Sequence, residues 1–233
     1  MCTITRITIL GMALMTFTLA QAVPLVNLYA PANVGIGSIG VDYNDTTKTI
    51  TITEDWTQPG PGYLQIENLE VGEIYTIIKI INNNTGLDWT SLANELLDPE
   101  GTDDSGESRP YPPHVPSGYT TSSNGDGLSF AQRADPPIPR TSSVFNSLIQ
   151  DELFASRDFL DFYNGILASG QQGDVSYGLS LNTSSNQPFL LSQRPNTCSE
   201  GECPFIVPEP ASLVLLGIGL GGLMLQGYRR RNS

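Results

Sequence analysis

Hydrophobic and polar residues alternate along the middle of the chain, and this pattern predicts β-strands. Ile50 and Ile52 alternate with threonines in residues 48–54, the two-residue period of a strand with one buried face. Residues 63–69 repeat the alternation. Residues 73–82 form a denser run of β-branched side chains, which predicts a central strand buried on both faces.

The same pattern continues toward the C-terminal half and predicts an all-β fold. Residues 88–97 form a further strand with Trp89 as a core aromatic, and three later segments (158–167, 174–182 and 188–193) close the structure. We expect one antiparallel β-sandwich over residues 23–197. Its two faces would share the following side chains: Phe159, Leu160, Phe162, Val175, Tyr177, Leu179 and Leu181.

Residues 98–143 interrupt the strand pattern with a long insertion rich in proline, glycine and serine. A segment of this length is unusual for an ordinary loop, and we expect an extended surface excursion with one short strand at 128–131. Residues 145–154 have weak helical spacing. Such an excursion on a rigid scaffold could carry a binding function, or it could be a poorly ordered insertion.

The C-terminal end predicts a single transmembrane helix. Residues 211–225 carry no charge, and 226–228 extend the segment up to Arg229, Arg230 and Arg231. A membrane helix needs roughly 20 apolar residues, so the span 211–228 is short but sufficient if the arginines lie at the interface. Because basic residues stay on the cytoplasmic side, the preceding chain would lie across the membrane.

The N-terminal end predicts a signal peptide over residues 1–22. Arg6 precedes an apolar stretch, and Ala20 and Ala22 form the small-residue site that signal peptidase cleaves. The mature chain would then begin at Val23 and form one exported domain, followed by a linker over 198–207.

A resemblance accompanies the C-terminal pattern. Val207, Pro208, Glu209 and Pro210, followed by the apolar segment and the three arginines, resemble the bacterial PEP-CTERM sorting signal. The resemblance implies that an exosortase, a membrane protease, recognises Val207–Pro210 and that the tail 208–233 holds the protein in the inner membrane transiently. Delivery to the cell surface or the extracellular matrix would follow. A permanent single-span anchor is the alternative.

A second resemblance lies in residues 73–92. Their strand, Asn-Asn-Thr-Gly turn, Trp-Thr and second strand are similar to segments of exported PEP-CTERM proteins with Ig-like β-sandwich ectodomains. The resemblance implies an Ig-like architecture and no particular activity.

The chain is strongly acidic, with 24 acidic and 11 basic residues and a formal net charge of −13. The exported part is more acidic still, because the three terminal arginines lie outside it. Such a surface repels nucleic acid, attracts divalent cations and keeps the protein soluble.

Two cysteines, Cys198 and Cys203, remain after export. Outside the cytoplasm this spacing favours a disulfide that closes a small loop in the linker. Two thiolates without a nearby histidine do not complete a zinc site.

The sequence gives little support for catalysis or a cofactor. His114 is the only histidine, lies among prolines, and has no nucleophile elbow to serve. Oxygen-rich stretches at 98–107 and 42–45, together with Asp126, could hold a structural calcium, but none has the spacing of a calcium loop. We therefore expect no enzyme and no cofactor, with calcium as the open alternative.

These observations together predict an exported bacterial surface or extracellular-matrix protein that is structural or adhesive in a biofilm or exopolysaccharide. One alternative is a carbohydrate- or calcium-binding module, and a less favoured one is a secreted hydrolase. Sugar binding would need exposed aromatic side chains on one sheet face, for which the candidates are Trp56, Tyr63, Tyr111 and Tyr119.

Overall fold

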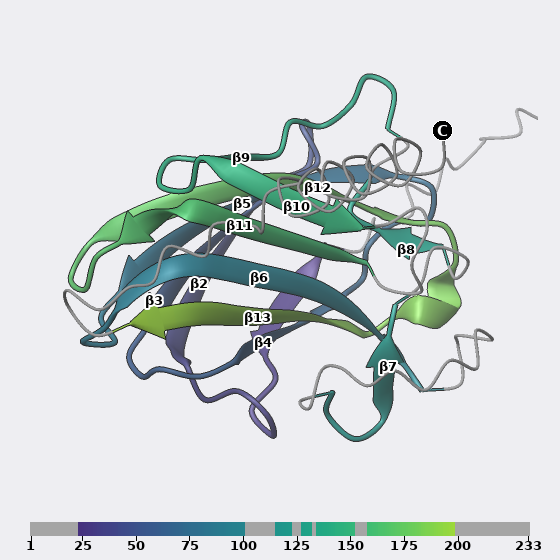
Figure 1. Cartoon of the computed structure of the whole chain (residues 1–233). Helices are drawn as coiled ribbons and strands as arrows, with labels where there is room; N and C mark the ends of the chain where they lie inside the picture. The colour runs from purple at the N-terminus through teal and green to yellow at the C-terminus, as the bar shows by residue number, and fades with distance from the viewer. Residues whose placement is uncertain (1–22, 101–114, 123–126, 132–133, 152–157, 199–233) are drawn as a thin grey trace, which may run out of the picture.

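The structure is a computed structural model of the 233-residue chain. It describes residues 23–100, 115–122, 127–131, 134–151 and 158–198. These residues form strands in two sheets, together with one short 3-10 turn at Ser184–Asn186 (Figure 1). The expected all-β fold is therefore confirmed.

The first sheet, sheet A, contains seven antiparallel strands. Its central strands are β13, β6 and β11, and β7 pairs with the end of β6. In spatial order the strands are β1 (Leu25–Leu28), β4 (Gly62–Glu67), β13 (Phe189–Cys198), β6 (Asp88–Pro99), β11 (Phe159–Leu167) and β10 (Ser147–Asp151), with β7 (Tyr119–Thr121) beside β6.

The second sheet, sheet B, contains six strands. In spatial order they are β2 (Ile36–Asn44), β3 (Thr49–Trp56), β5 (Ile74–Asn83), β12 (Gln172–Leu181) and β8 (Leu128–Ser129), with β9 (Thr141–Ser142) also paired to β12.

Sheet B is mixed, so the prediction of a wholly antiparallel sandwich is wrong at one pair. Strands β3 and β5 are parallel, with Ile52 opposite Lys79. The reason is topological: after β3 the chain enters sheet A to form β4 and then returns to sheet B in the original direction. The Ig-like topology stays a prediction.

The two sheets face each other across one hydrophobic core. Ile50 and Ile52 of β3 are fully buried there, as the alternating sequence predicts. Trp56 of sheet B meets Trp89 of sheet A edge to face, with ring centroids 4.9 Å apart. This is a favoured geometry for aromatic rings and joins the layers near one end of β6.

Strand β5 is central, but the prediction that both of its faces are buried is wrong. Tyr75, Ile77 and Ile81 point into the core, whereas Ile74 is 37% exposed. Ile78, on the same face as Ile74, is partly exposed. The isoleucines on the outward face obscured the two-residue period in the sequence.

The described parts of the insertion pack against both sheets: β7 pairs with β6 of sheet A, and β8 and β9 pair with β12 of sheet B. Phe130 is buried and contacts the ring of Tyr177 edge to face at 5.3 Å between centroids. On the outer side of β12, a Cβ at Gly178 would lie only 2.7 Å from the Cβ of Ala131. Of the short strand predicted at 128–131, only Leu128–Ser129 is a strand, β8. Leu128 and Phe130 belong to the main core, so the insertion contributes to the core and not only to the surface.

The weak helical prediction for residues 145–154 is wrong. Residues 147–151 form strand β10, which pairs with β11 in antiparallel register, Ile149 opposite Asp161. Phe145 is buried in the main core just before this strand. Pairing with the edge of sheet A therefore overrides a weak local preference.

The alternation along β3 gives a testable pair of substitutions. Ile50→Ala should lower the unfolding free energy by about 2–4 kcal/mol, because it leaves a cavity between the sheets. Thr51→Ala, on the partly exposed face of the same strand, should cost less than about 1 kcal/mol. Urea unfolding followed by tryptophan fluorescence measures both, and equal losses would contradict the assigned faces.

Candidate functional site

A buried charged pair lies between the two sheets. Lys79 of β5 and Glu54 of β3 are both fully buried, with the lysine Nζ 3.4 Å from the glutamate Oε1. Each occupies an inward position of its strand, where the neighbouring inward residues are large and apolar. Charged side chains are almost never fully buried unless they are paired, so this pair is an unusual feature of the core.

Carboxamides from sheet A complete the cluster. The Nζ of Lys79 donates to the Oδ1 of Asn94 on β6 at 3.2 Å, and the Nε2 of Gln193 on β13 donates to the Glu54 Oε1 at 2.8 Å. The Nε1 of Trp56 donates to the Glu54 Oε2 at 3.0 Å. Asn94 and Gln193 are directly opposite in the β6–β13 register, so both face sheet B at the same level.

Burial governs the chemistry of this cluster. Removal from water lowers the pKa of the Lys79 ammonium, and the nearby Glu54 carboxylate opposes that shift. Desolvation of two charges is expensive, and the extra hydrogen bonds from Gln193 and Trp56 offset part of its cost. The result is an amine that gives up its proton more readily than a lysine at the surface.

Two polar atoms beside the charged pair have no hydrogen-bond partner among the described residues: the Tyr177 hydroxyl and the Gln193 Oε1. Burial raises the pKa of Tyr177 well above its usual value of 10.0, and the negative charge of Glu54 adds to the shift. The hydroxyl therefore stays protonated at neutral and moderately alkaline pH.

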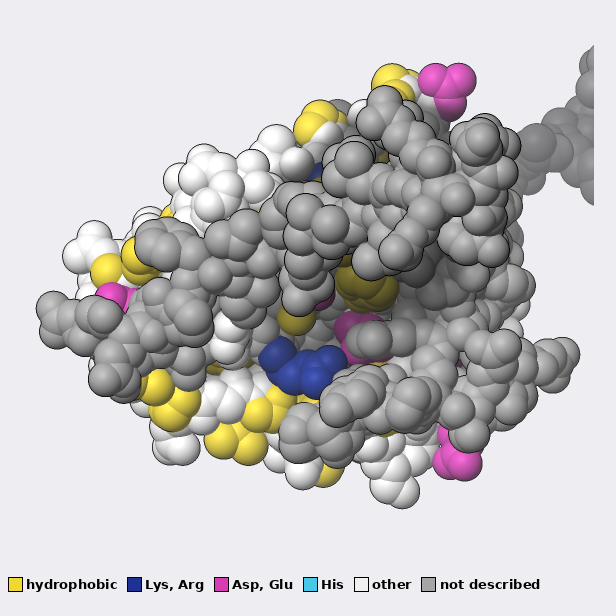
Figure 2. Space-filling view, viewed as in Figure 1, with side chains coloured by type: hydrophobic (Ala, Val, Ile, Leu, Met, Phe, Trp, Pro, Cys, Tyr) yellow, Lys and Arg dark blue, Asp and Glu magenta, His cyan; other side chains and the backbone are white. Residues whose placement is uncertain are grey.

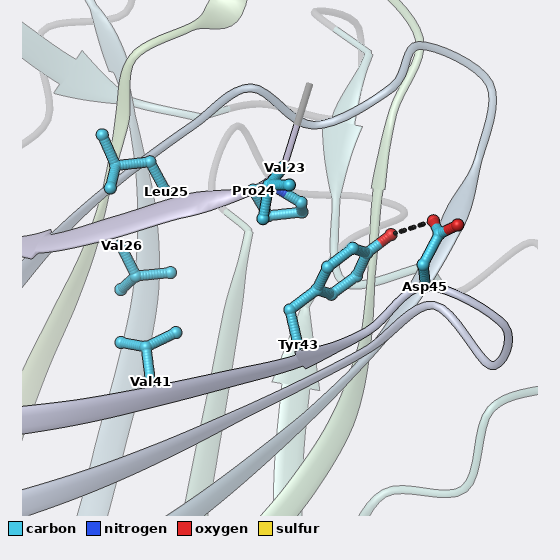
Figure 3. A pocket seen from close by; sticks show the side chains of 7 residues that line it. All are labelled: Val23, Pro24, Leu25, Val26, Val41, Tyr43 and Asp45. Carbon is cyan, nitrogen blue, oxygen red and sulfur yellow. Dashed lines mark hydrogen bonds between the residues drawn. The ribbon is translucent and has the colours of Figure 1, made fainter. Parts of the chain in front are cut away.

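A crevice of about 590 Å³ opens where the edge strands β1 and β2 approach each other (Figure 3). Aliphatic side chains line most of it, and the Tyr43 hydroxyl and Asp45 form a polar corner. Its lining residues are Val23, Pro24, Leu25, Val26, Val41, Tyr43 and Asp45. The crevice has the apolar character of a small binding pocket but brings no catalytic group together.

The polar corner of the crevice is neutralised internally. The Asp45 carboxylate accepts hydrogen bonds from the Tyr43 hydroxyl at 2.9 Å and from the Lys48 Nζ at 2.8 Å. Both hydrogen bonds lower the pKa of Asp45, and the bond from Lys48 has the larger effect. Lys48 also pairs with Glu70 at 2.8 Å. Asp45 therefore already has a cationic partner.

The structure tests the calcium alternative only in part. Within the described ranges there is no group of three or more side chains suited to hold a metal ion. In the stretch 42–45, the Asn44 side chain accepts hydrogen bonds from the backbone amides of Thr46 and Thr47. Residues 101–107 and Asp126 lie outside the described residues.

Two of the four aromatic candidates for an exposed sugar-binding face are buried. Trp56 and Tyr63 are 0% and 1% exposed, so neither can stack on a ligand from solution. Tyr119 is half-buried and packs edge to face against Tyr29, with centroids 5.4 Å apart. Tyr111 lies outside the described residues.

A row of hydrogen-bonded polar side chains crosses the outer face of sheet B. Asp55 of β3 accepts from the Ser38 hydroxyl at 2.8 Å and from the Asn82 amide at 2.6 Å. The amide of Gln172 continues the row by donating to Asn82 at 2.8 Å. The row spans four neighbouring strands, about 14 Å at the usual strand spacing.

The outer face of sheet A carries few charges where the structure describes it. Arg194 of β13 pairs with Glu95 of β6 at 3.2 Å across the two strands. Figure 2 shows one small basic patch on this face, with acidic side chains beside it and hydrophobic and neutral ones around. The basic charge here is paired and does not form a continuous anion-binding surface.

The predicted processing residues lie outside the described residues. They are Ala20, Ala22, Val207, Pro208, Glu209, Pro210, Arg229, Arg230 and Arg231. His114 and Cys203 also lie outside the described residues. Cys198 is the last residue of β13. Because its partner Cys203 is not described, the disulfide stays a prediction. Among the residues that are described, no helix is long and apolar enough to cross a membrane; the predicted span 211–228 is not among them.

Comparison with known proteins decides the nature of the C-terminal tail. The family model of the PEP-CTERM protein-sorting motif matches residues 207–231. The chain carries a PEP-CTERM sorting signal. The motif supports export of this PEP-CTERM protein and its sorting to the cell surface by an exosortase, as the sequence predicts. No curated protein and no solved structure matched the chain.

Sequence reasoning missed the buried cluster, although a signal for it exists. Lys79 is the one charged residue in the apolar run of β5. It lies an even number of residues from Tyr75, Ile77 and Ile81, and therefore on the same face of the strand. Glu54 likewise follows Ile50 and Ile52 at even spacing. A charged residue at even spacing from buried apolar residues of the same strand indicates a side chain that points inward and is paired.

The buried Tyr177 hydroxyl, which has no hydrogen-bond partner among the described residues, yields a prediction about pH. Because the folded pKa of Tyr177 lies above its unfolded value near 10, its stabilising contribution is complete below pH 10 and is lost as pH rises further. Tyr177→Phe should change the unfolding free energy by less than about 1 kcal/mol at pH 7, because no hydrogen bond is removed. It should also reduce the loss of stability above pH 10.

Denaturant unfolding at pH 7 and at several alkaline values measures this effect. Tyr43→Phe is the matched control, because it removes a hydroxyl that does donate a hydrogen bond, to Asp45. A large neutral-pH loss for Tyr177→Phe would contradict the assignment.

Proposed function

We propose that the folded part of this PEP-CTERM protein has a structural or adhesive role outside the cell, in a biofilm or exopolysaccharide matrix. The single observation that carries the proposal is the sorting motif at 207–231, which lies C-terminal to a two-sheet β domain that ends at Cys198. Strands in two facing layers are a common architecture of cell-surface domains. In this role the domain would convert no external substrate and would need no resident cofactor.

Several features of the described residues support a passive scaffold. The two layers share one continuous core, and Leu128 and Phe130 of the long insertion belong to it. The acidic composition keeps such a domain soluble and separate outside the cell. The crevice between β1 and β2 is apolar apart from the Tyr43 hydroxyl and Asp45, which are hydrogen-bonded to each other.

A neutral polysaccharide is the second candidate ligand, favoured by the polar row on sheet B. Ser38, Asp55, Asn82 and Gln172 present hydroxyl, carboxylate and amide groups in a line that a sugar chain could follow. The acidic surface disfavours anionic polymers. The row lacks stacking aromatics, so binding would depend on hydrogen bonds and would be weak per site.

Processing of the tail gives the first test. The C-terminal peptide of the native protein, analysed by mass spectrometry in membrane, surface and medium fractions, should end near Pro208–Pro210 outside the membrane. Replacing Pro208, Glu209 and Pro210 by alanine should retain the intact tail in the membrane fraction. Glu202→Ala, an equal charge change outside the matched motif, should be processed normally. An intact tail through Ser233 in all fractions of the wild type would refute processing.

The role itself is tested in the producing bacterium. Loss of the protein should weaken matrix cohesion, measured as the shear needed to disperse a biofilm, and the wild-type chain should restore it. Restoration by a chain that cannot leave the membrane would contradict a role in the matrix.

The second candidate has its own readout. Binding of the exported protein to a glycan array should fall at least about tenfold for the double variant Asn82→Ala and Gln172→Ala if the polar row holds sugars. Thr46→Ala, in a turn away from this row, is the control. No binding by the wild type would remove the candidate.

A further inference from the structure

We propose that this protein forms an internal covalent cross-link, an amide bond between the Nζ of Lys79 and the Cγ of Asn94, with Glu54 as the catalytic carboxyl group. The bond would join β5 of sheet B to β6 of sheet A through the middle of the core. The inference is independent of the proposed role outside the cell and concerns the chemistry of the buried cluster.

The reacting groups already lie in contact. The Lys79 Nζ is 3.2 Å from the Asn94 Oδ1 and 3.4 Å from the Glu54 Oε1. All three side chains are 0% exposed. Groups held together at contact distance react as if at very high concentration, because folding has already removed their relative freedom. An ordinary carboxamide resists amines in water, so this proximity is essential.

The asparagine is held with its carbonyl toward the lysine. Its Nδ2 lies 3.3 Å from the backbone carbonyl of Leu160 and 3.4 Å from that of Leu92. The side chain therefore presents its oxygen to sheet B. Gln193, its neighbour across the strands, instead directs its Nε2 to Glu54 at 2.8 Å.

The environment supplies an uncharged nucleophile. A lysine attacks a carbonyl only as the free amine, and burial lowers the pKa of Lys79 toward that form. Transfer of one proton from Nζ to Glu54 converts the buried ion pair into two neutral groups. This transfer removes the cost of keeping two charges in an apolar core.

The reaction balances without an added reagent. The Nζ lone pair attacks the Cγ of Asn94, while the protonated Glu54 donates a hydrogen bond to the developing oxyanion on Oδ1. The Cγ–Nδ2 bond then breaks, and the nitrogen leaves as ammonia. Of the three protons on the lysine ammonium, one remains as the amide N–H, one leaves on ammonia and one stays on Glu54.

The position of the bond gives it a structural purpose. Strand β5 lies between β3 and β12, and β6 lies between β13 and β11, so both linked strands are internal to their sheets. The bond would prevent the layers from separating even when the noncovalent core loosens. This is the protection that disulfides provide elsewhere, here without cysteine.

The decisive measurement is a mass analysis of the native exported protein. After denaturation and digestion with trypsin, an acylated Lys79 cannot be cleaved, so residues Thr49–Arg133 should appear joined across position 79. The joined fragment should be lighter than its sequence mass by about 17 Da, the mass of ammonia released on amide formation. Fragmentation should locate the branch at Lys79 and Asn94.

Substitutions test the role of each group. Lys79→Arg and Glu54→Gln should abolish the mass loss, and Lys48→Arg, at a surface lysine, should retain it. Asn94→Asp should still react but should lose water, about 18 Da, because the leaving group changes. Near-ultraviolet circular dichroism of the Trp56–Trp89 contact reports whether each variant is folded.

Stability provides a second readout. Folded Glu54→Gln protein without the bond should have a Tm lower by about 10 °C than the wild type. A folded wild-type protein with the full sequence mass and normal cleavage after Lys79 would overturn the proposal. So would a branch that maps to Gln193, or a mass loss that persists in folded Lys79→Arg protein.

Discussion

A lysine ammonium between two β-sheets must find an anion and hydrogen-bond acceptors in the core, and this requirement fixes much of the fold. Glu54 can reach Lys79 only because β3 and β5 run parallel in one register. Asn94 and Gln193 can meet the pair only because β6 and β13 place them opposite each other. A slip of one residue in any of these strands would turn a charge or a carboxamide outward and leave its partner buried alone. The cluster therefore specifies the register of four strands.

The sequence predicts the strands well and their arrangement only in part. The alternation around Ile50 and the dense run before Asn83 locate β3 and β5, because a two-residue period reports which face is buried. It does not report which strands are neighbours, so the parallel pair was missed. Residues 145–154 were assigned the wrong local structure, since pairing with β11 is a tertiary interaction that no local pattern records.

The functional features divide in the same way. The sorting tail is recognisable because its order of short motif, apolar segment and arginines is linear in the sequence. The core cluster joins residues up to 139 positions apart, such as Gln193 and Glu54, and only folding brings them together. Trp56 illustrates the converse error: an aromatic that suits sugar binding by its type donates its indole N–H to a buried carboxylate instead.

The place of β13 has a mechanical consequence. It is the last described strand before the sorting tail. It pairs with β6 from Leu190 to Cys198, and with β4 over Phe189–Gln193. A force applied from the C-terminal side would pull along the strand and load its ladder with β6 in shear, and the ladder with β4 would share that load over Phe189–Gln193. A force from the N-terminal side would meet β1, which is bonded to β4 alone and could peel away first. Under tension between its two ends, the domain would thus lose β1 before β13.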